Sequence, residues 1–156
     1  MKPEIQTLRA EIAADLDAIA EIYVALEHPN LELADEDQRI IVAYHLHNLY
    51  SAFESIFQRI ARLFGNRLDD QAGWHADLLA RMRLDVEGLR PRVISGATYD
   101  CLDELRRFRH LFRSGYRLHL DPERLAVVRN KARRLEGLYR ADLDRFMAFL
   151  AELAQA

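Results

Sequence analysis

A cationic stretch, residues 106–120, holds the side chains best suited to chemistry. Its sequence, RRFRHLFRSGYRLHL, contains five arginines, two histidines and a tyrosine, although the whole chain of 156 residues carries a net charge of −3. On a helix, positions i, i+3, i+4, i+7 and i+11 share one face, which here carries Arg106, Arg109, His110, Arg113 and Arg117. Guanidinium groups suit bidentate phosphate recognition. The stretch therefore indicates either a phosphate-binding site or an arginine-rich, solvated helix face.

The same residue types can supply the parts of a site that cleaves a phosphodiester. Such a site needs a cation to stabilise the charge that develops on phosphorus, and a titratable group to move protons. In RNA the 2′-hydroxyl can act as the internal nucleophile, so no metal is required. Arg113, Tyr116 and His119 lie near the turn that Ser114 and Gly115 predict. Together they can supply the parts of a ribonuclease site.

The histidines outside this stretch and the single cysteine have simpler structural interpretations. His45 and His47 lie two positions apart on a helix, so they point to different faces and cannot chelate one metal together. We interpret them as surface or packed histidines, His75 beside Trp74 as a histidine at the core edge, and Cys101 as a small buried thiol. Neither a glycine-rich phosphate loop nor a metal-binding pattern occurs, so we expect no cofactor and no metal.

The elements that position these residues are helices. Apolar residues recur at steps of three and four, no alternating strand pattern occurs, and the chain has only six Gly and four Pro. Ser95 or Thr98 is expected to cap one helix, and Asp121 followed by Pro122 to begin the next. The sequence predicts an all-α antiparallel bundle of about five helices in a single domain, residues 1–156, with helices near 5–26, 37–64, 70–88, 98–114 and 122–153.

Composition and charge narrow the class of protein. One cysteine excludes an internal disulfide, the first residues are too acidic for a signal peptide, and no segment approaches the length of a membrane span. We expect a cytoplasmic protein with no membrane contact. Residues 1–40 hold three basic and ten acidic residues, whereas 101–140 hold eleven basic and five acidic. The basic segment therefore faces phosphate or an acidic protein surface, or else the acidic and basic helices are neighbours.

Several short motifs, combined with a helical bundle, resemble the HEPN superfamily and specifically its HepT-like proteins. They are RPRVIS (90–95), FRH (108–110) with Tyr116, and LDPERL (120–125). The similarity extends from FESIFQRIA (53–61) to DLDRFMAFL (142–150). The resemblance implies a metal-independent ribonuclease toxin that acts on RNA as a homodimer, with two copies of the motif lining one cleft. It also implies a partner, an MNT-type nucleotidyltransferase antitoxin that adenylylates the motif tyrosine.

The HepT motif is an arginine, four residues, a histidine, one residue and a tyrosine. In this sequence Arg109 takes the arginine place and Tyr116 the tyrosine place, but Ser114 stands where the histidine is expected. A serine does not titrate near neutral pH, so it cannot replace imidazole in proton transfer.

Three consequences of this departure remain open. His110 takes over the proton transfer, or His119 does so at a looser spacing from Arg113, or the domain binds a nucleotidyltransferase, a nucleotide or RNA without cleaving it. For an active enzyme the predicted roles are phosphate binding by Arg109 and Arg113, proton transfer by one of these histidines, and regulatory modification at Tyr116.

Overall fold

The structure, a computed structural model, describes residues 2–28, 31–65, 72–114 and 119–156. These residues form six helices: α1 (Lys2–Leu26), α2 (Glu36–Leu63), α3 (Trp74–Met82), α4 (Gly96–Ser114), α5 (Pro122–Glu136) and α6 (Tyr139–Gln155). Within these ranges the only β-type pairing is an isolated bridge between Val86 and Arg90. The predicted all-α bundle is confirmed, with six helices in place of about five.

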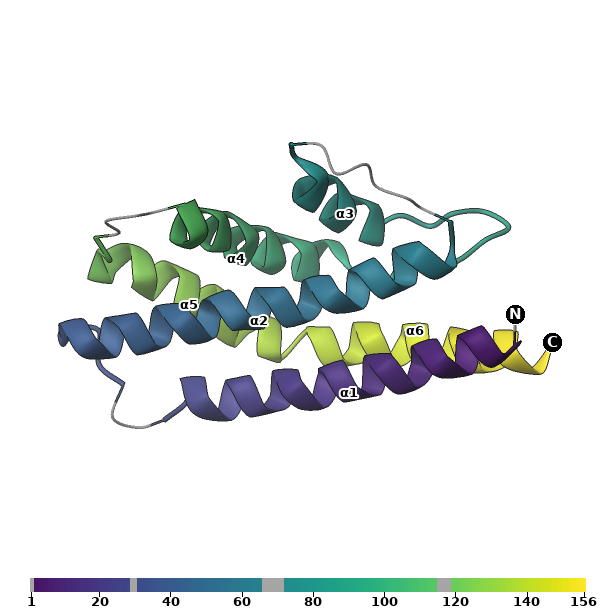
Figure 1. Ribbon diagram of the computed structural model, residues 1–156, viewed down its shortest axis with the longest axis horizontal. Helices are drawn as coiled ribbons and strands as arrows, with labels where there is room; N and C mark the ends of the chain where they lie inside the picture. The colour runs from purple at the N-terminus through teal and green to yellow at the C-terminus, as the bar shows by residue number, and fades with distance from the viewer. Residues whose placement is uncertain (1, 29–30, 66–71, 115–118) are drawn as a thin grey trace.

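Helix α2 is the centre of the bundle. It contacts α1, α3, α4 and α5, while α6 packs against α1. Figure 1 shows α1 and α2 as a long antiparallel pair, with both chain termini at one end of the molecule and the last turn of α4 near the other end. The cationic end of α4 therefore lies beside the first half of α2, far from the termini.

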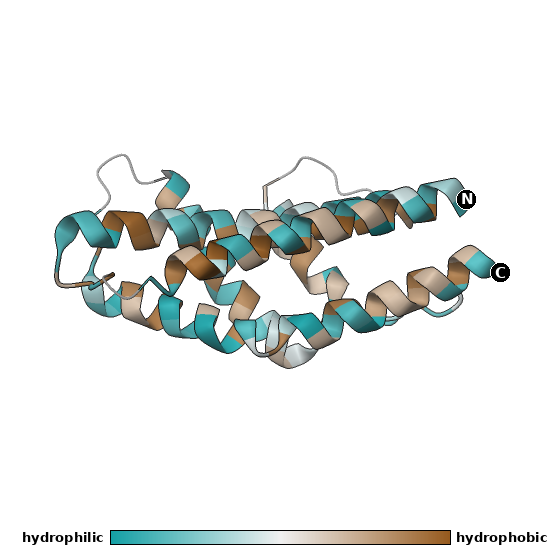
Figure 2. Cartoon of the chain, turned by 90° about the horizontal axis from the view of Figure 1, so that it is seen from below, coloured by the Kyte–Doolittle hydropathy of each residue, from teal (hydrophilic) through white to brown (hydrophobic). Residues whose placement is uncertain are grey.

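The apolar stripes explain why these helices pack. The α1 stripe is buried along its whole length, at Ile5, Leu8, Ile12, Leu16, Ile19, Tyr23 and Leu26. Figure 2 shows that each long helix carries both hydrophobic (brown) and hydrophilic (teal) residues, as expected for helices with one apolar face. Burying such stripes against one another is the main favourable contribution to the fold.

Side-chain caps fix where the helices begin. Asp35 accepts hydrogen bonds from the amides of Asp37 and Gln38 at the start of α2. The predicted caps are confirmed: Asp121 accepts from the amide of Glu123, with Pro122 in the first turn of α5, and Ser95 Oγ accepts from the amide of Thr98. Each cap satisfies an amide that has no partner within its own helix.

The single helix predicted over 122–153 is wrong in one respect, because it breaks at Gly137. The amides of Gly137 and Leu138 bond to carbonyls three residues earlier, at 3.2 and 2.9 Å, and α6 then starts at Tyr139. Such bonds tighten the last turn of a helix. Just after the break the Tyr139 ring is buried, stacking on Tyr23 at 5.8 Å between centroids and meeting Phe53 edge-on at 5.3 Å.

The helix predicted to end near Gly88 also stops earlier, at Met82. Gly88 has a φ of +75°, a backbone conformation that favours glycine, in the turn closed by the Val86–Arg90 bridge. The buried Arg90 guanidinium donates hydrogen bonds to the carbonyls of Arg81, Leu84 and Pro91. An arginine downstream of α3 thus satisfies carbonyls at its end and replaces a further helical turn.

Acidic residues of α1, and Glu27 just after it, form ion pairs with α2 and α5. Arg59 of α2 forms ion pairs with Glu11 at 3.0 Å and Asp15 at 3.1 Å, and Arg133 of α5 pairs with Glu27 at 3.4 Å. The acidic N-terminal segment therefore neighbours basic residues of α2 and α5, while Arg109 near the end of α4 pairs with Glu54 of α2.

None of the described helices combines the length and the apolar character needed to cross a membrane.

Candidate functional site

A buried carboxylate, Glu54 of α2, joins three helices. Its side chain is 6% exposed, and Arg109 of α4 donates from Nη1 to Glu54 Oε1 at 3.0 Å. His75 of α3 contacts the other oxygen, with 2.8 Å between His75 Nδ1 and Glu54 Oε2. Burying a carboxylate is costly unless it is paired and hydrogen-bonded. Both oxygens of Glu54 have such a partner, each from a different helix.

Helical spacing brings the α2 members of the site together. His47, Tyr50 and Glu54 stand at i, i+3 and i+7, so they form one strip along the side of α2 that meets α4. The ring of His47 lies 5.2 Å from that of Phe112, and Arg109 lies over the Tyr50 ring at 5.6 Å. Later residues of α4 thus meet earlier residues of α2.

The guanidinium of Arg109 lies inside the protein. Its side chain is only 13% exposed, and its Nε is buried with no hydrogen-bond partner among the described residues. The Tyr50 hydroxyl is likewise buried and unpartnered there. Burial and the nearby Glu54 charge raise the pKa of Tyr50, so its hydroxyl stays protonated. Arg109 therefore contributes positive charge from below the surface.

The other arginines of α4 divide into paired and unpaired groups. Arg106 and Arg107 both donate to Asp103, one turn earlier on the same helix. Burial opposes ionisation of Asp103, but these hydrogen bonds and charges lower its pKa. Arg113 is exposed and forms no ion pair within the described ranges. It is therefore the arginine of this helix best placed to meet an anion from solution.

His47 is a member of the site that sequence reasoning missed. It is half-buried, and its Nδ1 is buried without a hydrogen-bond partner in the described part of the chain. Burial lowers the pKa of His47, and the charges of Arg109 and Arg113 lower it further. The one available signal was its spacing from Tyr50 and Glu54, which places a buried acid and a histidine on one strip of α2.

The two remaining simple interpretations are confirmed. His75 stacks on Trp74 with 3.6 Å between ring centroids and is half-buried at the edge of the core. Cys101 is fully buried, and burial raises the pKa of its thiol.

The predicted site residues are distributed unevenly. His110 is exposed on α4, and His119 is exposed where the description resumes before α5. Tyr116 lies outside the described residues, and so does the side chain of Ser114. Where the chain is described, no three or more His, Cys, Asp or Glu residues form a cluster that could hold a metal ion.

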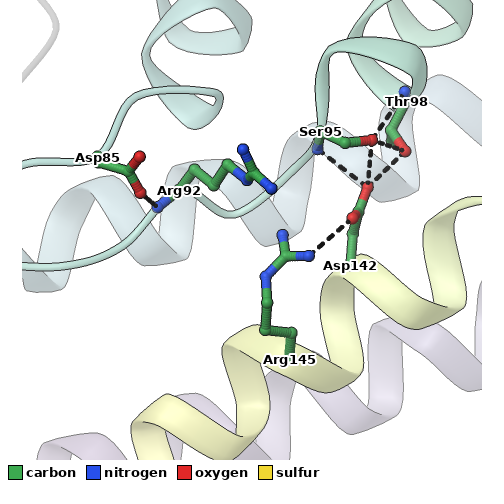
Figure 3. A network of polar contacts seen from close by, with 6 residues as sticks. All are labelled: Asp85, Arg92, Ser95, Thr98, Asp142 and Arg145. Atoms are coloured by element: carbon green, nitrogen blue, oxygen red, sulfur yellow. Dashed lines mark hydrogen bonds and ion pairs between the residues drawn. The ribbon is translucent and has the colours of Figure 1, made fainter.

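A second polar cluster anchors the opposite end of α4 (Figure 3). Asp142 of α6 accepts from the Ser95 amide and the Ser95 hydroxyl, both at 3.0 Å, and from the Thr98 hydroxyl. Arg145 pairs with its other oxygen at 3.2 Å. Burial opposes ionisation of Asp142, but the hydrogen bonds from Ser95 and Thr98 lower its pKa. This cluster holds the first turn of α4 against α6.

A family model described as HepT-like protein matches residues 41–150, well over half of the chain. The chain belongs to the HepT-like family of the HEPN superfamily. The match confirms the resemblance seen in the sequence, and it extends from α2 into α6, so it contains Glu54, His75 and all of α4. No curated protein and no solved structure matches this HepT-like chain.

Proposed function

We propose that this HepT-like protein is a metal-independent endoribonuclease, the toxin of a HEPN/MNT type toxin–antitoxin pair, acting on RNA as a cytoplasmic homodimer. One observation carries the proposal. Arg113, exposed and without an ion pair among the described residues, stands one turn beyond Arg109, whose buried charge is paired with Glu54. An exposed arginine can bind a phosphate directly, and a buried arginine behind it can help to stabilise the negative charge of the transition state.

In this proposal the residues of α4 have separate roles. Arg113 binds the phosphate directly, because its guanidinium reaches solvent. Arg109 raises the positive potential behind it while its Nη1 stays bonded to Glu54. His110 or His119 is the proton-transfer residue that the motif offers, and Tyr116 is the position modified by the nucleotidyltransferase antitoxin.

A second candidate function follows from one departure from the motif and one structural contact. Ser114 occupies the histidine place, and Arg109 is engaged by Glu54. Both would suit a HEPN dimer without catalytic activity. Such a dimer would bind a nucleotidyltransferase partner, a nucleotide or RNA through the same cationic end of α4.

RNA cleavage in EDTA separates the two functions. The purified protein should cut labelled RNA without metal, and Arg113→Ala should abolish cutting. Arg62→Ala, which removes an exposed arginine from the last turn of α2, should cut normally. Salt-sensitive RNA binding without cleavage would favour the second function. Cleavage that survives the double change Arg109→Ala and Arg113→Ala would rule out the assigned site.

The proposed partner needs its own experiment. The protein should be co-expressed with a nucleotidyltransferase encoded beside it, and its intact mass then measured. An adenylyl adduct that disappears in Tyr116→Phe supports the modification. Neither an adduct nor co-purification would contradict the two-component system, whatever the result of the cleavage assay.

A further inference from the structure

The side of α2 that meets α4 places an imidazole beside the cationic end of α4. His47 packs its ring 5.2 Å from that of Phe112, which lies between Arg109 and Arg113 in the sequence. The two arginines are one helical turn apart, so they flank the contact. The half-buried His47 side chain therefore contacts the end of α4 from α2 and is still partly exposed to solvent.

The charged groups around His47 favour its neutral form. Arg109 and Arg113 face it from α4, and their charges act with burial to lower its pKa. The acid nearest along its own strip is Glu54, two turns away, whose oxygens are taken by Arg109 and His75. A neutral imidazole near pH 7 can accept a proton, as a general base must.

Four other histidines of the described residues have different surroundings. His45 is two residues away on α2, and only burial lowers its pKa. His75 is bonded to Glu54. His110 and His119 are exposed. His47 combines a ring contact to α4 with the charges of both Arg109 and Arg113.

We propose that His47 is the proton-transfer residue of the α4 site, supplying from α2 the imidazole that Ser114 does not provide. This inference rests on the proposed ribonuclease function and replaces His110 and His119 in that role. His47 Nδ1 is buried and the residue is half-buried, so we assign the proton transfer to Nε2.

The reaction step is a transesterification within RNA. His47 Nε2 takes the proton of the 2′-hydroxyl, and the 2′-oxygen forms a bond to phosphorus. The bond from phosphorus to the 5′-oxygen breaks, and the leaving oxygen takes a proton from water. The products are a 2′,3′-cyclic phosphate and a 5′-hydroxyl end. Arg113 binds the phosphate oxygens while their charge increases.

Single-turnover cleavage of a labelled RNA in EDTA tests the role. His47→Gln should lower the rate by about 100-fold or more, while the Kd for a non-cleavable 2′-O-methyl RNA changes by less than about twofold. His45→Gln, the matched control on the same helix, should cleave at the wild-type rate. Circular dichroism confirms that each variant folds, and His47→Asn serves if the glutamine variant does not.

Two further results separate this inference from the proposed function. Normal cleavage by His47→Gln, with loss of cleavage in His110→Gln or His119→Gln, would overturn the role of His47 and leave the ribonuclease intact. A wild-type protein that cleaves no RNA would overturn both.

NMR of the histidine rings gives a readout that does not depend on cleavage. Adding the 2′-O-methyl RNA should shift the His47 ring signals in the wild type and leave them unchanged in Arg113→Ala. Bound RNA without a shift at His47 would overturn its place in the site.

Discussion

Glu54 and Asp142 are both buried carboxylates that hold α4, but their partners differ in kind. Asp142 accepts mainly from neutral donors, the Ser95 amide and the Ser95 and Thr98 hydroxyls, in a compact cap. Glu54 binds an arginine and a histidine from two other helices. Beside it lie three buried polar atoms without partners in the described structure: His47 Nδ1, Tyr50 Oη and Arg109 Nε.

This difference indicates that the Asp142 cluster is structural, whereas the Glu54 cluster belongs to the candidate site. Most buried polar groups in folded proteins are hydrogen-bonded, so a local group of unpartnered atoms needs an explanation. None of the polar side-chain atoms of Ser95, Thr98 and Asp142 is buried without a partner. The cluster around Glu54 combines unpartnered atoms with the positive charges of Arg109 and Arg113 and with the shifted pKa values of His47 and Tyr50, and clusters of shifted pKa values are common at functional sites.

The largest expected effect comes from removing the carboxylate of Glu54. Glu54→Ala leaves the Arg109 charge buried and unpaired, so we expect a loss of about 3–5 kcal/mol in the free energy of unfolding. Urea denaturation measures it. The double variant Glu54→Leu and Arg109→Leu should recover most of the loss. A single variant as stable as the wild type would show that the pair does not hold α4.

Arg113→Ala should affect function and leave stability unchanged. Its guanidinium is exposed and unpaired among the described residues, so unfolding should change by less than about 0.5 kcal/mol. RNA cleavage should fall by about 100-fold or more, because losing one donor to the charge of the transition state costs about that much. If Arg113→Ala lost much stability but cleaved RNA normally, Arg113 would be a structural residue and not part of the site.

Asp142→Asn should lower stability and leave RNA cleavage nearly unchanged. Asparagine keeps the size of the side chain but loses the charge that accepts from Ser95 and Thr98, so we expect a loss of about 1–3 kcal/mol on unfolding. The cleavage rate per folded molecule should stay within about twofold of the wild type. A selective loss of cleavage would mean that the anchor also takes part in the site.

The smallest effect is a pH dependence of stability near neutrality. The pKa of His47 is lowered in the folded protein by burial and then by Arg109 and Arg113, and that of His45 by burial. The unfolded chain therefore takes up protons first as pH falls through about 6.5, and stability should decrease in that window. Unfolding measured between pH 8 and 5.5 should depend less on pH in His47→Gln. An unchanged slope would contradict the lowered pKa.

The sequence predicts most of the fold because the signals are local. The α1 stripe and the caps at Asp121 and Ser95 depend on residues only a few positions apart. Two boundaries were missed for physical reasons. Gly137 lies between two amphipathic segments, and an isolated glycine does not always end a helix. Arg90 satisfies carbonyls at the end of α3 from a downstream loop, which periodicity does not detect.

The candidate site could be predicted only in part. The cationic face of α4 follows from residue spacing, but Glu54 and Arg109 are 55 positions apart, and their contact depends on how the helices pack. The sequence did offer one indication, since Glu54 lies between buried residues of α2 such as Phe53 and Phe57. An acid within a buried stripe requires a partner, although it does not identify which one.

The ion pair between Glu54 and Arg109 also restricts how this protein can change over generations. A single replacement at either position strands a charge in the interior, so it should be tolerated poorly. Relatives that lose the arginine are then expected to have lost the acid as well. Covariation of positions 54 and 109 across homologous sequences would show that this contact constrains both residues.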